Sequence, residues 1–127
     1  MAVNVIKTDK APGAVGPYSQ GIKAGNILFA SGQIALNPET GKRVGGGVAA
    51  EAEQCMKNVG ALLEAAGMSY DNVVKTTVYL TNMDFFGTVN TVYGKYFSST
   101  LPARSCVTVA ALPKGALVEV EVTAYAE

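Results

Sequence analysis

The sequence contains no histidine and no tryptophan among its 127 residues. Histidine is the side chain that most often exchanges protons near neutral pH, so any acid–base chemistry here depends on other groups. Serine nucleophiles are disfavoured for the same reason, because no imidazole is present to activate a hydroxyl. The simplest remaining machinery is an arginine that fixes a carboxylate, together with a glutamate that holds a water molecule.

Charge is also scarce. Charged residues make up 16% of the chain, and ten Lys and Arg residues balance ten Asp and Glu residues. An average soluble chain has about 25% charged residues. A neutral chain without a basic stripe is a poor nucleic-acid binder, because phosphate contacts need clustered Lys and Arg. Since 49% of the residues are hydrophobic, we expect a homo-oligomer that buries apolar surface between copies.

The chain has two cysteines, Cys55 and Cys106. They form no Cys-x-x-Cys pair and have no histidine to complete a metal site, so we expect no metal. Cys55 falls in a helical pattern and is interpreted as a small buried apolar residue. Cys106 is less certain, because it follows Arg104 by two residues on the same strand face. The glycine-rich stretches match neither a Walker nor a dinucleotide pattern, so no nucleotide cofactor is expected.

The length of the chain predicts one domain over residues 1–127. No run approaches the roughly 18 apolar residues that a membrane span requires. The first residues lack both an apolar signal core and an arginine-rich amphipathic leader. We therefore expect a cytoplasmic protein with no membrane partner.

Periodicity predicts six strands and two helices. Apolar residues recur at helical spacing over 48–66, closed by Gly67 as a left-handed cap, and again after a predicted N-cap at Asp84. The segment from residue 73 to 81 is rich in β-branched residues and is interpreted as a strand. The other strands are predicted over 3–7, 21–24, 27–35, 101–110 and 117–124.

The order β-β-β-α-β-α-β-β predicts an α+β fold with a mixed sheet. Both helices connect strands as crossovers, and right-handed crossovers between parallel strands place them on the same face of the sheet. The opposite face is then uncovered in a monomer. This arrangement supports the homo-oligomer that composition predicts.

Arg104 is the strongest candidate for binding a substrate. It lies near the start of a strand, just after Pro102, which cannot sit in the middle of a sheet. In the last strand, Glu119 and Glu121 alternate with valines, so both face the same side. We expect Arg104 to share a sheet face with one of them. The alternatives are a salt bridge between neighbouring strands and a solvated strand face.

Two polar segments are further candidates. Tyr18, within Gly16 to Gly21, offers a phenol and an aromatic wall, and Ser31 offers a hydroxyl. Gly32 lacks a side chain, so its backbone N–H can approach a ligand closely. The alternative is that these residues only satisfy nearby backbone groups. Neither segment is a Gly-x-Ser-x-Gly elbow.

Taken together, the motifs resemble the RidA family, the YjgF-like reactive intermediate deaminases. Any single motif is weak, but their order and spacing are specific, and the match covers almost the whole chain. The matching segments are 16–21 (GPYSQG), 31–34 (SGQI), 54–58 (QCMKN), 65–67 (AAG), 74–78 (VKTTV), 89–93 (VNTVY), 102–106 (PARSC), 112–113 (LP) and 118–121 (VEVE).

The resemblance implies a chorismate-mutase-like α+β fold, assembled as a homotrimer with clefts between subunits. It implies hydrolysis of small 2-imino or enamine acids, such as 2-iminobutanoate and 2-iminopropanoate, to 2-keto acids and ammonia. By position, Arg104 would grip the substrate carboxylate, and Glu119 and Cys106 would hold the attacking water. Tyr18, Ser31 and Gly32 would line the pocket. Asn90 matches another recurrent family position, which we interpret as structural.

Other functions besides imine hydrolysis are compatible with the same residues. Arg104 would serve equally well in a keto-acid-binding protein, and the protein could also act as a chaperone-like interaction module. Relatives of this fold have been described as translation inhibitors with ribonuclease activity. The absence of histidine and of net positive charge disfavours RNA cleavage, which usually needs a general acid–base pair.

Overall fold

The computed structural model describes residues 3–127. The predicted order of strands and helices is confirmed. Its elements are β1 (Val3–Ile6), β2 (Gly21–Ala24), β3 (Ile27–Ala30), α1 (Gly47–Ala65), β4 (Val73–Leu80), α2 (Phe86–Gly94), β5 (Ala103–Thr108) and β6 (Val118–Tyr125).

Three predicted boundaries are wrong. The strand predicted over 101–110 is shorter and spans Ala103–Thr108. The third strand ends at Ala30. The Ser31 N–H still bonds the Gln20 carbonyl, but the chain then leaves β2 and meets the sheet again only at an isolated bridge between Gln33 and Val120. The predicted N-cap at Asp84 is also wrong. Asn82 accepts a hydrogen bond from the Asp84 N–H and caps a short 3₁₀ turn, so α2 starts at Phe86.

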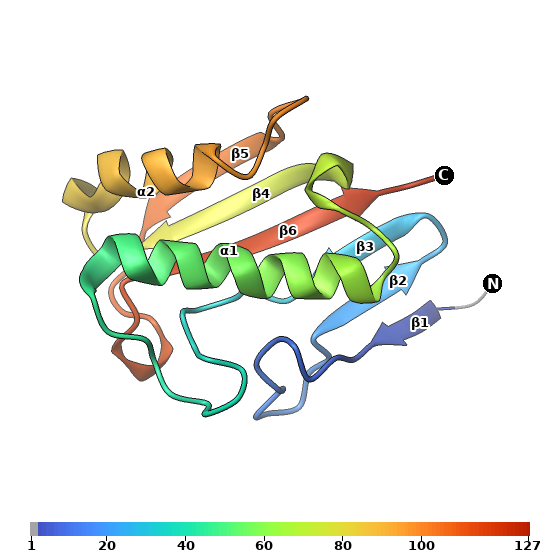
Figure 1. Cartoon of the computed structure of the whole chain (residues 1–127), viewed down its shortest axis with the longest axis horizontal. Coiled ribbons are helices and arrows are strands. Elements are labelled where there is room, and N and C mark those ends of the chain that lie inside the picture. The colour runs from blue at the N-terminus through green and yellow to red at the C-terminus, as the bar shows by residue number, and fades with distance from the viewer. Residues whose placement is uncertain (1–2) are drawn as a thin grey trace.

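The sheet has the strand order β1-β2-β3-β6-β4-β5. Strands β4 and β5 are parallel, whereas β6 is antiparallel to both β3 and β4. Strands β3 and β4 therefore run parallel to each other, joined through α1, and α2 joins β4 to β5. The two crossovers advance across the sheet in the same direction, so both helices cover one face, as predicted (Figure 1).

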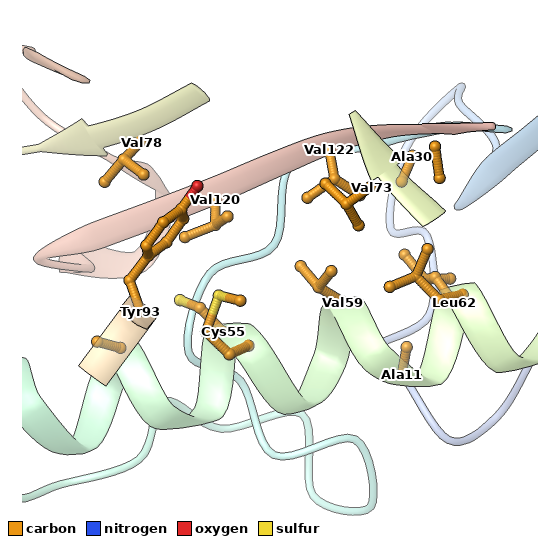
Figure 2. Close-up of a cluster of buried hydrophobic side chains, with 14 of the residues drawn as sticks. Ala11, Ala30, Cys55, Val59, Leu62, Val73, Val78, Tyr93, Val120 and Val122 are labelled. Atoms are coloured by element: carbon orange, nitrogen blue, oxygen red, sulfur yellow. The ribbon is translucent and has the colours of Figure 1, made fainter. Parts of the chain in front are cut away.

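The core lies between these helices and the sheet. Side chains of α1, among them Cys55, Val59 and Leu62, point toward Val120 and Val122 of β6 (Figure 2). Each of these five side chains is at most 2% exposed. This alternation confirms that the valines of β6 face the core while Glu119 and Glu121 face the other way.

The opposite face of the sheet carries apolar side chains that no helix or strand within residues 3–127 covers. Val5, Phe29 and Val107 are 63%, 51% and 42% exposed, and the strand pairings place all three on that face. Among the described residues, no helix is long and apolar enough to cross a membrane.

Candidate functional site

Arg104 lies on the helix-covered side of the sheet. In the parallel pairing of β4 and β5 it is the partner of Thr76, and Cys106 is the partner of Val78. Paired residues of neighbouring strands point to the same face. Thr76 and Val78 are 0% and 1% exposed beneath the helices, so Arg104 and Cys106 share the helix side.

Helix α2 supplies the surroundings of the Arg104 guanidinium. Its Nη1 donates a hydrogen bond of 2.7 Å to Asn90 Oδ1. The guanidinium carbon lies 5.0 Å from the centre of the Tyr93 ring and 5.5 Å from that of Phe86. These are cation–π distances. Arg104 is thus held by an amide and two aromatic rings, without an ion pair to Glu119 or Glu121.

The three residues that hold Arg104 form one stripe of α2. Phe86, Asn90 and Tyr93 are spaced i, i+4 and i+7 along the helix. Tyr93 is itself fixed, because its hydroxyl lies 2.8 Å from the hydroxyl of the fully buried Thr76. The sequence predicts only a structural role for Asn90 and no separate role for Tyr93. Their common spacing was the available signal for a shared partner.

Glu119 lies on the other side of the sheet. It pairs with Tyr79 of β4, and both side chains are directed away from the helices. Glu119 borders a cavity of about 220 Å³, together with Tyr18 and Gly32. Gly32 is required for this packing, since a Cβ added there would lie 2.8 Å from the Glu119 carboxyl carbon.

The prediction that Arg104 shares a sheet face with Glu119 or Glu121 is therefore wrong for a single chain. On β4, Arg104 pairs with Thr76, which faces the helices. Glu119 and Glu121 pair with Tyr79 and Thr77, which face the other way. Sequence alternation gives the faces within one strand but not the relative phase of two strands. Arg104 does not border the Glu119 cavity.

The two glutamates differ in their surroundings. Burial, and to a smaller extent the neighbouring Glu121 charge, raise the pKa of Glu119 above its usual value. Glu121 accepts a hydrogen bond of 3.0 Å from the Tyr79 hydroxyl. Because Glu119 faces the cavity, it is the better placed of the two to contact a small molecule.

The two cysteines also differ. Cys106 is partly buried beside Arg104, and burial raises the pKa of its thiol, although the guanidinium opposes the shift. Burial raises the pKa of Cys55 much further, and its thiol donates to the Val118 carbonyl at 3.6 Å. The interpretation of Cys55 as a buried core residue is confirmed, since it is 0% exposed.

The remaining candidates lie around the Glu119 cavity. Tyr18 is 52% exposed and borders both this cavity and a larger open hollow beside β1. The Ser31 hydroxyl donates a 2.6 Å hydrogen bond to the Ser19 carbonyl. Ser31 thus fixes the loop that carries Tyr18. Among residues 3–127, no group of three or more His, Cys, Asp or Glu side chains is arranged to hold a metal ion.

The protein is an α+β protein with a six-stranded mixed sheet and two helices on one face. Its candidate site residues Arg104 and Glu119 lie on opposite faces of that sheet. Residues 8–126 match the protein family described as Endoribonuclease L-PSP. The 2-iminobutanoate/2-iminopropanoate deaminase of Mus musculus is 52% identical over 120 residues, which cover 94% of this chain and 89% of that protein.

Solved structures agree with this match. A protein of the conserved Rid family, YyfA from Yersinia pestis, superposes with a TM-score of 0.95 at 50% identity, covering 98% of this chain and 100% of that one. E. coli TdcF with bound serine gives a TM-score of 0.94 at 42% identity, covering 98% and 99%. The chain therefore belongs to the RidA and YjgF family.

Proposed function

We propose that this protein is a hydrolytic deaminase that converts 2-iminobutanoate and 2-iminopropanoate to 2-keto acids and ammonia. The site would be a cleft between two copies of the chain, within a homotrimer. Arg104 of one copy would bind the substrate carboxylate, and Glu119 of its neighbour would hold the attacking water. Two relatives that are 52% identical to this chain and are named 2-iminobutanoate/2-iminopropanoate deaminase support the reaction.

The main support for a cleft shared between two copies is that Arg104 and Glu119 lie on opposite faces of one sheet. A single copy cannot present both groups to one small acid. The uncovered apolar face of the sheet offers the surface on which another copy would pack. A closed ring of copies would bring the arginine side of one chain to the glutamate side of the next.

The proposed reaction suits these residues. A protonated imine is already a good electrophile, so the protein has to orient water rather than create a strong nucleophile. Water adds to the imine carbon to give a carbinolamine, which then loses ammonia and leaves the 2-keto acid. A guanidinium binds the planar carboxylate with two parallel N–H groups.

The other residues would have supporting roles. Cys106 lies on the arginine side and would contact the water together with Glu119. Tyr18 and Gly32, which border the Glu119 cavity, would form its wall, and Ser31 would fix the loop that carries Tyr18. The bound serine named for E. coli TdcF supports a site for a small acid with an amino or imino nitrogen.

The first test measures ammonia release from 2-iminobutanoate, generated from threonine by a pyridoxal-phosphate-dependent dehydratase. We expect the wild-type protein to accelerate the release and Arg104→Ala to abolish the acceleration while leaving the fold intact. Equal rates for the two proteins would overturn the proposal. A keto-acid-binding or chaperone-like protein would leave imine decay unchanged or slow it.

A second test addresses the shared cleft. Arg104→Ala and Glu119→Ala chains are unfolded, mixed in equal amounts and refolded together. If each site takes one residue from each of two chains, about a quarter of the sites regain both residues, because each intact residue is present in half of the cases. If both residues act within one chain, the mixture stays inactive.

The family name Endoribonuclease L-PSP makes RNA cleavage a control. A chain without histidine and with no net charge lacks the usual acid–base pair and the cationic surface for phosphate. We therefore expect no cleavage of a single-stranded RNA under conditions in which the imine is hydrolysed. Cleavage that persists in Arg104→Ala would point to a separate activity.

A further inference from the structure

Helix α1 carries two buried polar side chains, Glu51 and Asn58. They are 2% and 1% exposed, and residues seven apart lie on the same face of a helix. Burying a carboxylate or an amide is unfavourable unless it is hydrogen-bonded. Both side chains bond to backbone groups of segments that border the Glu119 cavity.

Asn58 holds one wall of this cavity. Its Nδ2 donates to the carbonyls of Ile34, at 3.2 Å, and Leu36, at 3.0 Å. Its Oδ1 accepts from Gln54 Nε2 at 2.9 Å, so both polar atoms of the amide are bonded. Ile34 and Leu36 line the cavity, and this wall is therefore fixed directly to α1.

Glu51 holds the other wall through a longer chain of contacts. Its Oε1 accepts the Leu117 N–H at 2.9 Å, and its Oε2 lies 3.6 Å from Arg43 Nε. Arg43 Nη1 in turn donates to the carbonyls of Lys114, at 3.3 Å, and Gly115. Glu51 and Arg43 thus form a latch between α1 and the segment from residue 112 to 117.

This segment needs to be held. Lys114 has φ 57° and ψ 24°, a left-handed conformation that is unfavourable for a residue with a side chain. Pro113 and Lys114 border the cavity next to Glu119, and Leu117 precedes Glu119 by two residues. A shift of the segment would therefore move both the cavity wall and the start of the strand that carries Glu119.

We propose that Glu51 and Arg43 are positioning residues for Glu119. The latch fixes the segment from residue 112 to 117 against α1, and Asn58 fixes the opposite wall, so the distance between the walls is set by one helix. The catalytic part of this inference rests on the proposed function, whereas the holding of the segment does not.

The kinetic test uses Arg43→Met, because the Arg43 side chain is 39% exposed and methionine keeps an apolar side chain of similar length while removing the charge. We expect kcat to fall about tenfold and KM to change less than about twofold, since Arg104, which would bind the substrate carboxylate, lies on the other face of the sheet. Arg43→Lys, which keeps the charge next to Glu51, should recover part of the lost kcat. The matched control Lys10→Met breaks the exposed pair with Glu64 and should leave kcat unchanged.

Hydrogen exchange gives a readout that does not depend on activity. The amide of Leu117 should exchange faster in Arg43→Met and in Glu51→Gln than in the wild type, and at an unchanged rate in Lys10→Met. Unchanged exchange over residues 112–117 in Arg43→Met, or unchanged kcat despite faster exchange, would overturn the proposal. A wild-type protein without deaminase activity would remove the proposed function, while the exchange measurement would still decide whether the latch holds the segment.

Discussion

Gly32 lies so close to Glu119 that no side chain fits between them. A Cβ at position 32 would be 2.8 Å from the Glu119 carboxyl carbon, well inside van der Waals contact. The backbone at Gly32 therefore closes one side of the carboxylate, and the position of Glu119 depends on the absence of a side chain there.

Gly32→Ala is expected to displace Glu119 and to lower kcat about tenfold or more, because a shift of an ångström misplaces the water that Glu119 would hold. Steady-state kinetics on 2-iminobutanoate measure this effect. Gly87→Ala is the matched control, since a Cβ there meets no atom within 4 Å. It should leave kcat unchanged and stabilise the protein by about 0.5–1 kcal/mol, as expected for alanine in a helix.

Asn90 orients the Arg104 guanidinium through a single hydrogen bond of 2.7 Å. Asn90→Ala should raise KM about tenfold with a smaller change in kcat, because the guanidinium would lose its fixed direction. Asn90→Asp should raise KM further, since the new carboxylate would compete with the substrate for Arg104. A KM in Asn90→Asp equal to that of the wild type would contradict this role.

Tyr93 makes two contacts, one through its hydroxyl with Thr76 and one through its ring with Arg104. Two substitutions distinguish their effects. Tyr93→Phe keeps the ring beside Arg104 but removes the bond to the buried Thr76 hydroxyl. We expect a loss of about 1–3 kcal/mol in the free energy of unfolding, from the unsatisfied buried hydroxyl, and little change in KM. Tyr93→Leu also removes the cation–π contact, so KM should rise. Denaturant unfolding and kinetics on the two variants check both effects.

The pKa of Glu119 is raised, mainly by burial and secondly by Glu121, and the proposed mechanism needs the ionised form. We expect kcat to fall on acidification at a pH above the usual range for a carboxyl group. Glu121→Gln removes the second cause, so the acidic limb of the pH–rate profile should move to lower pH. A limb that stays in place would mean that Glu119 does not control it.

The same shift has a consequence for stability. Because the pKa of Glu119 is higher in the folded state than in the unfolded state, the folded protein binds this proton more tightly. Protonation of Glu119 therefore stabilises the fold at low pH, and this stabilisation is lost as the pH rises through the raised pKa. Glu119→Gln should therefore unfold at a higher temperature than the wild type at neutral pH. The difference should shrink below the usual pKa of a carboxyl group.

The Arg104 region shows how far the sequence could predict the site. Pro102 and the strand pattern after it correctly placed Arg104 near a strand end, because proline restricts the backbone locally. Asn90 was recognised only as a recurrent position. Its contact with Arg104 required the docking of α2 on β5, which joins residues 14 apart, and helical spacing alone does not identify the partner.

The elements, their order and the helix-covered face were determined by the sequence, since periodicity and turn residues act over a few residues and crossover handedness follows from chain chirality. Which residues of β5 and of β6 face the same side of the sheet was decided only when both strands paired with β4. Strand pairing is a long-range choice, and a shift of one residue exchanges the faces of a strand. Tertiary structure therefore separated Arg104 from Glu119, and joined Glu51 to the segment that precedes Glu119.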